Sequence, residues 1–178
     1  MKTYIALFKS INVGGRNRLP MRELVEVLEG LKLKNIETYI QSGNIVFQSE
    51  DMNAPELSER IGAAINKSHG FTPQVLLLEL DELERAIASN PYPEAESEPK
   101  SLHLYFLASE PKDVDLKTLE SIRSDSEQFT LKGEVFYLHA PDGIGRSKLA
   151  ARVEKALGVT VTARNWRSVN RILAMAKR

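Results

Sequence analysis

The chain has 178 residues, a formal net charge of zero and no cysteine. That length suffices for one compact domain or for two small ones sharing a core, without covalent staples. The absence of cysteine excludes disulfides, thiolate nucleophiles and zinc sites of the cysteine type. The N-terminus turns polar after a short apolar run, so we expect a cytoplasmic protein with no signal peptide and no membrane span.

The neutral net charge hides a division along the chain. Residues 49–127 carry a formal charge of −10, whereas residues 142–178 carry +7. A basic segment on a neutral protein raises the local potential for phosphate or carboxylate groups. The alternative is that the basic end pairs with the acidic middle of the same chain, and the sequence leaves both open.

Periodicity predicts the order β-α-β-β-α-β in the first part of the chain, the split βαβ pattern of ferredoxin-like folds. Aromatic and β-branched residues mark the strands, proline opens both helices, and glycine ends the second helix. The expected elements are a strand at 3–9, a helix at 20–31, a hairpin of 38–41 and 44–48, a helix from 55 to 70 and a strand at 73–79.

The same order starts again after a linking segment, residues 81–100, which is expected to hold a short helix capped by Asp81 and an exposed proline-rich loop. The overall expectation is an α+β fold of two ferredoxin-like repeats in tandem, residues 1–80 and 101–178, with antiparallel or mixed sheets covered by helices in one compact protein. The second repeat is expected to contain a strand at 102–107, a helix capped by Asp115, a hairpin of 128–132 and 134–140, a helix at 147–157, a strand at 159–162 and an extra C-terminal helix at 165–176.

In each repeat the topology brings polar loops to one edge of the sheet. A βαβ crossover makes its two strands parallel, and a hairpin reverses the chain direction. In the first repeat this places the loop of residues 11–20 beside the hairpin turn, with Gly14 and Gly15 baring backbone amides. The side chains expected to converge there are those of Asn12, Arg16, Asn17, Gln41, Ser42 and Asn44.

In the second repeat the same rule gathers residues 143–148 and 162–167 at one edge. Glycines, a helix N-terminus and two cations come together there, and these are the elements of an anion site. The spacing is not that of a Walker loop. The alternative is an ordinary turn in which Ser147 caps the helix, with a solvated basic face and Trp166 anchored in the core. The expected ligand-binding residues are Gly143, Gly145, Arg146, Ser147, Lys148, Arg164, Asn165 and Trp166.

A second pattern lies on two strands that are neighbours in this topology. His103 and Tyr105 alternate with apolar residues on one strand, as do Tyr137 and His139 on the other. We therefore expect one aromatic and polar sheet face, of the kind that single-strand RNA binders use to stack bases, with the two histidines close together. The glycines and basic residue of the RNA-binding motif are missing, and the alternative is that this face packs on the other repeat. A metal at the two histidines would need Asp142 as a third ligand, and none is expected.

Five segments, in order, carry a resemblance to a known family: INVGGRNRLPM, YIQSGNIVF, NPYP, GIGRSKL and TARNWRSV. Over nearly its whole length the chain resembles the bacterial family catalogued as domain of unknown function 1697. The resemblance implies an α+β fold of two ferredoxin-like repeats. It implies no established activity and supplies no catalytic residues.

Three functions remain open from the sequence. The leading hypothesis is a small protein that binds a phosphorylated or carboxylated ligand, nucleotides among them, at the glycine-rich basic loops. The second is a single-stranded nucleic-acid binding module that uses the aromatic sheet face. The third is an enzyme of unidentified class, since a catalytic set whose members lie far apart in the chain cannot be assembled from spacing. The sequence assigns no cofactor, no membrane partner and no oligomeric state.

Overall fold

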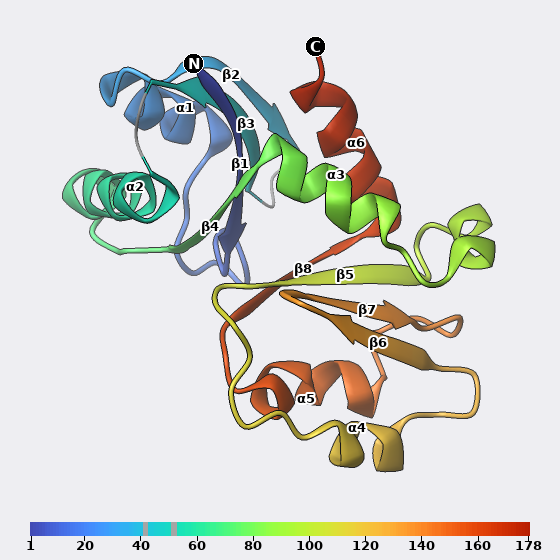
Figure 1. The fold of residues 1–178 in the computed structure, drawn as a ribbon. Coiled ribbons are helices and arrows are strands. Elements are labelled where there is room, and N and C mark those ends of the chain that lie inside the picture. Colours follow the sequence, from blue (N-terminus) through green and yellow to red (C-terminus); the bar gives the residue numbers. More distant parts are fainter. Residues whose placement is uncertain (41–42, 51–52) are drawn as a thin grey trace. The chain divides into compact units, whose positions relative to one another are not determined.

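The computed structural model describes residues 1–40, 43–50 and 53–178 (Figure 1). Within these residues the chain forms two four-stranded antiparallel sheets, six α-helices and one short 3-10 helix, consistent with two tandem βαββαβ units. In chain order the elements are β1 (Lys2–Lys9), α1 (Met21–Gly30), β2 (Lys34–Tyr39), β3 (Asn44–Ser49), α2 (Ala54–His69), β4 (Gln74–Glu79), α3 (Leu80–Ala88), η1 (Pro93–Ser97), β5 (Leu102–Leu107), α4 (Leu116–Ile122), β6 (Gln128–Lys132), β7 (Val135–His139), α5 (Lys148–Leu157), β8 (Val161–Asn165) and α6 (Trp166–Ala176).

The chain divides into two compact units. Unit 1 comprises Met1–Arg85 and Arg171–Arg178, and unit 2 comprises Ala86–Asn170, so the division falls within α3 and within α6. The last eight residues therefore belong to unit 1, where the Arg178 guanidinium lies 2.8 Å from the carboxylate of Glu37. In the described part of the chain, no helix is long and apolar enough to cross a membrane.

Unit 1 contains the sheet in the order β2-β3-β1-β4, with α1 and α2 on one face (Figure 1). Alternate residues of β1, Tyr4, Ala6 and Phe8, point toward these helices and are fully buried with Leu24 of α1 and Leu57 of α2. This alternation is the period of two that strands impose, and it explains why an aromatic and β-branched segment forms the central strand.

The edge strand β2 differs from its expected position at 38–41. It begins at Lys34, which pairs with Gln48, and the register shifts before Glu37. Asn35, inside this irregular part, has a φ of 52°. Polar residues in a bulged edge strand show no period of two, so the sequence pattern does not mark them as a strand.

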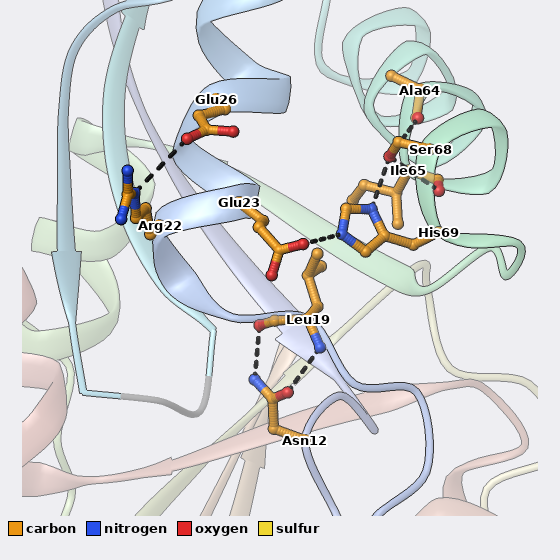
Figure 2. Close-up of polar contacts among 9 residues, drawn as sticks. All are labelled: Asn12, Leu19, Arg22, Glu23, Glu26, Ala64, Ile65, Ser68 and His69. Carbon is orange, nitrogen blue, oxygen red and sulfur yellow. Dashed lines mark hydrogen bonds and ion pairs between the residues drawn. The ribbon is translucent and has the colours of Figure 1, made fainter.

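Contacts between side chains join α1 to α2 (Figure 2). The Oγ atom of Ser68 lies 2.6 Å from Nδ1 of His69, and Nε2 of His69 lies 3.3 Å from the carboxylate of Glu23 in α1. The end of α2 is therefore fixed to the start of α1 by a polar contact in addition to the apolar core. The Arg22–Glu26 pair, 3.7 Å long and exposed, contributes little by comparison.

Unit 2 contains the sheet in the order β6-β7-β5-β8, with α4 and α5 on one face (Figure 1). Tyr105 and Phe136 pack in its core against Leu119 of α4 and Leu149 of α5. The helix α5 ends as expected at Gly158, which has a φ of 70° and whose Cβ, if present, would lie 2.2 Å from the carbonyl oxygen of Lys112. No other residue fits that position without moving the backbone.

The register of unit 2 shows that the expected aromatic sheet face is wrong. His103 lies opposite Leu138, whereas His139 lies opposite Leu102. Since directly paired residues point to the same face, His103 and Tyr105 face α4 and α5, and His139 faces the opposite side with Tyr137. All six residues of β5 are buried, so this strand is buried on both faces and its alternation does not identify a solvent-exposed face.

Gly43, in the turn before β3, gives the first prediction. It has a φ of +79°, and a Cβ there would lie 2.6 Å from Cβ of Phe8 and 2.8 Å from Cδ1 of Ile11. Gly43→Ala therefore adds a steric clash with the core to the strain of a left-handed backbone. We expect the free energy of unfolding in urea to fall by about 3 kcal/mol or more.

The matched control is Gly15→Ala in the same unit. Gly15 has a φ of +72°, and a Cβ there would meet nothing within 4 Å. Only backbone strain is added, so we expect a loss of about 1 kcal/mol. Equal losses for the two substitutions would show that the contact with Phe8 and Ile11 does not constrain the turn.

Candidate functional site

The loop that follows β1 is closed by its own polar groups (Figure 2). The side-chain amide of Asn12 donates to the carbonyl of Leu19 at 2.8 Å, and the Leu19 N–H donates to the side-chain oxygen of Asn12 at 2.7 Å. Asn17 donates from its side chain to the carbonyl of Ser10 at 3.2 Å. The two asparagines that the sequence predicts as ligand groups thus bind the backbone of their own loop.

The other members of this first cluster lie in the turns at the same sheet edge. Gly14 and Gly15, with φ of 59° and 72°, form the exposed turn that pairs Val13 with Arg16. As the topology predicts, the loop lies beside the β2–β3 turn, whose Gly43 carbonyl accepts the N–H of Phe8 at 2.9 Å.

Asn44 is fully buried, and its side chain donates to the carbonyl of Tyr39 at 3.1 Å. It therefore supports the β2–β3 turn from within. Gln41 and Ser42 lie outside the described residues. Of the predicted cluster, the structure leaves Arg16 as an exposed cation at this edge.

Unit 2 gathers its loop ends at one sheet edge, as the topology predicts. His139, at the end of β7, lies opposite Leu102, at the start of β5. Asn165, at the end of β8, lies opposite His103. The loop of residues 140–147 and the junction of β8 with α6 therefore start from the same edge of the sheet.

A cavity of about 340 Å³, here called the small cavity, lies beside this loop. It includes four of the predicted ligand residues, while Gly145 belongs to the loop without lining it. Its lining residues are Ile122, Ser124, Glu127, Asp142, Gly143, Arg146, Ser147 and Lys148. Arg146 and Lys148 are both exposed, so this cavity presents two cations to solvent.

Ser147 caps α5, as one of the two interpretations predicts. Its hydroxyl oxygen accepts the N–H of Ala150 at 3.0 Å, and the hydroxyl donates to a carboxylate oxygen of Glu127 at 2.5 Å. Glu127 is only 4% exposed, and its other oxygen accepts the N–H of Ser124 at 2.8 Å. The start of α5 thus faces an internal carboxylate, which is favourable at the positive end of a helix.

Three further predicted residues do not line the small cavity and instead form part of β8 and the start of α6. Arg164 lies opposite Leu104, on the sheet face that points away from α5, and burial lowers the pKa of its guanidinium to about 10. The side-chain oxygen of Asn165 accepts the N–H of Ser168 at 2.9 Å at the start of α6. Trp166 is 7% exposed, in agreement with the alternative in which it anchors the core.

A second cavity, here called the large cavity, has a volume of about 530 Å³ and shares two walls, Asp142 and Gly143, with the small one. Its lining residues are Glu98, Pro99, Lys100, Ser101, Ala140, Pro141, Asp142, Gly143 and Arg167. Arg167 is within the segment that the topology predicts at this sheet edge, but it is not among the expected ligand-binding residues.

Glu127 is a buried residue of this site that the sequence does not predict. It ends the segment Ser-Asp-Ser-Glu, which has the composition of an exposed turn. Its burial depends on Ser147, twenty residues further along the chain. Sequence periodicity carries no signal for a contact of that kind.

Within the ranges that the structure describes, no group of three or more histidine, aspartate or glutamate side chains is arranged to hold a metal ion. The two histidines considered above as ligands lie on opposite sheet faces. Nδ1 of His103 and Nδ1 of His139 are both buried and accept no hydrogen bond in the described part of the chain. Burial also lowers the pKa of His103, which favours the neutral ring.

Fold and site define an α+β protein with two four-stranded antiparallel sheets and two adjoining cavities in unit 2. The chain belongs to the family described as "Protein of unknown function (DUF1697)", whose model matches residues 1–137. It is similar to a solved structure, that of the conserved bacterial protein SP0830 from Streptococcus pneumoniae. The identity is 26%, the TM-score is 0.71, and the match covers 98% of each chain. No curated protein matches the sequence.

The contact between Ser147 and Glu127 gives the second prediction. Ser147→Ala removes the cap of α5 and also removes a donor from a buried carboxylate. We expect a loss of about 2–3 kcal/mol in the free energy of unfolding, measured by urea denaturation. The control is Asp115→Ala, which removes the cap of α4, a 3.1 Å bond from the Thr118 N–H, at an exposed position. There we expect about 1 kcal/mol, and equal losses would mean that Glu127 does not depend on Ser147.

Tyr105 gives a prediction for alkaline pH. Burial, and then the charge of Glu127, raise the pKa of Tyr105 to about 12, whereas an unfolded tyrosine ionises at about 10. The stability that this neutral phenol contributes is fully present below pH about 10 and is lost as the pH rises toward 12. Tyr105→Phe keeps the ring and removes the ionisation, so its free energy of unfolding should decline less than that of the wild type between these pH values.

The measurement is urea unfolding at several pH values from 8 to about 12. Tyr137, whose pKa burial raises to about 12, and Tyr92, whose pKa burial also raises, are retained in both proteins and contribute to the decline that should remain in the variant. An identical pH dependence in wild type and Tyr105→Phe would contradict the assignment.

Proposed function

We propose that this protein binds a small phosphorylated or carboxylated ligand in the small cavity of unit 2. The observation that supports this most directly is that Arg146 and Lys148 line one cavity together with Gly143. Neither cation forms an ion pair with any residue in the described ranges. Unpaired cations at a concave surface raise the local concentration of anions.

The carboxylates of Glu127 and Asp142 favour a ligand that carries hydrogen-bond donors as well as an anionic group. Both line the same cavity, and Asp142 accepts the hydroxyl of Ser126 at 2.8 Å. A bare anion would be repelled by them, whereas ligand hydroxyl or amine groups would donate hydrogen bonds to their oxygens. A ligand with an anionic group next to hydrogen-bond donors matches this arrangement. Sugar phosphates, mononucleotides and hydroxy acids have this chemistry.

Two finer expectations belong to the same proposal. Each half has the order βαββαβ, and in each the first strand lies between the third and the fourth, which supports two ferredoxin-like repeats. The absence of cysteine from the sequence supports a cytoplasmic location.

The test is a thermal-shift screen of these ligand classes, followed by titration calorimetry of any hit. A ligand at a hundred times its Kd stabilises the fold by about 2.7 kcal/mol, which a melting curve detects readily. In the double variant Arg146→Ala with Lys148→Ala, we expect affinity to fall at least about a hundredfold, because two charge-assisted contacts are lost.

The matched control also removes two positive charges, from positions in α5 away from the small cavity. Arg152 and Lys155 are exposed on α5 and do not line the small cavity. Arg152→Ala with Lys155→Ala should leave affinity within about twofold of the wild type, since only the long-range field changes. Unchanged affinity in the Arg146 and Lys148 double variant would refute the site. Hits confined to oligonucleotides and lost on adding salt would favour the nucleic-acid alternative.

A further inference from the structure

We propose that the large cavity of unit 2 holds an apolar body of the same ligand whose anionic group binds Arg146 and Lys148. This inference rests on the proposed function of the small cavity. The two cavities share Asp142 and Gly143 as lining residues, so they adjoin. Gly143 contributes no side chain to either cavity, and a Cβ at that position would meet nothing within 4 Å. A ligand in the small cavity therefore has the large cavity next to it.

The walls of the large cavity favour an apolar occupant. Pro99, Ala140 and Pro141 line it, and they offer no side-chain hydrogen-bonding group. The hydroxyl of Ser101, a buried residue of the lining, already donates to the carbonyl of Glu98 at 2.7 Å. A polar ligand body would therefore lose its hydration there with few replacement partners, whereas an apolar one gains by leaving water.

The volume of the large cavity and its two exposed cations also fit a ligand with an apolar body and an anionic group. About 530 Å³ lies within the range of cavities that enclose small organic ligands. Lys100 and Arg167 line this cavity and are exposed, and neither has an ion-pair partner within the described residues. An arginine beside an apolar wall packs its planar guanidinium against ring systems as well as aliphatic chains. The ligand class is thus an amphiphilic phosphate or carboxylate.

The experiment uses alkyl phosphates from methyl to octyl, titrated into the full-length protein below their micellar concentrations at constant salt. Because the head group is constant, the slope of log Kd against chain length measures burial of the apolar body. We expect Kd to fall about fourfold per added methylene group until the large cavity is filled. Pro141→Trp fills this cavity from an exposed position and should flatten the slope while leaving the Kd of methyl phosphate unchanged.

The control is Pro93→Trp, at an exposed proline outside both cavities, which should keep the wild-type slope. Should Pro141→Trp fail to fold, Lys100→Trp fills the same cavity from another wall. Two results would overturn this inference alone. One is that the Kd of the alkyl phosphates does not depend on chain length, and the other is that Pro141→Trp and Lys100→Trp keep the wild-type slope. If no alkyl phosphate binds although a sugar phosphate does, this inference fails and the proposed function stands.

Discussion

The hydrogen bond between Ser147 and the buried carboxylate of Glu127 is the contact on which the site depends. An ionised carboxylate that is withdrawn from water destabilises a fold by several kcal/mol unless donors replace its hydration. Here the donors are the Ser147 hydroxyl and the Ser124 N–H, and both serines line the small cavity. The start of α5, where Arg146 and Lys148 lie, is therefore held to the α4–β6 loop.

The two units have the same topology, but the polar side chains at their corresponding sheet edges are bonded differently. In unit 1, the side-chain amides of Asn12 and Asn17 donate hydrogen bonds to backbone carbonyls of the loop after β1. These two amides are therefore paired within the loop. In unit 2, the cap of α5 is supplied by one hydroxyl, and the neighbouring cations remain unpaired in the described part of the chain. The topology brings polar residues together in both units, and in unit 2 it leaves the charges of Arg146 and Lys148 beside a cavity.

What the sequence predicts well is what local geometry determines. Gly70 and Gly158 end helices because the left-handed backbone favours glycine, and Ser147 caps α5 because its hydroxyl reaches the next free N–H. The sequence does not predict features that depend on contacts with residues far away in the chain. The strand β5 is buried on both faces, so pairing with β7, not alternation, decides where His103 points. The burial of Glu127 likewise requires a residue twenty positions away.

The mixture of charges around the cavities decides which class of ligand fits best. The linings of the two cavities carry charges of both signs: four cations, Arg146, Lys148, Lys100 and Arg167, and three carboxylates, Glu127, Asp142 and Glu98. Opposite charges so close together largely cancel at a distance beyond the Debye length of about 8 Å. A polyanion such as nucleic acid, whose affinity comes from many phosphates meeting one basic surface, gains little from such a field. A small ligand gains more, because it can place its anionic group beside the cations and its donors beside the carboxylates at hydrogen-bonding distance, where screening is weak.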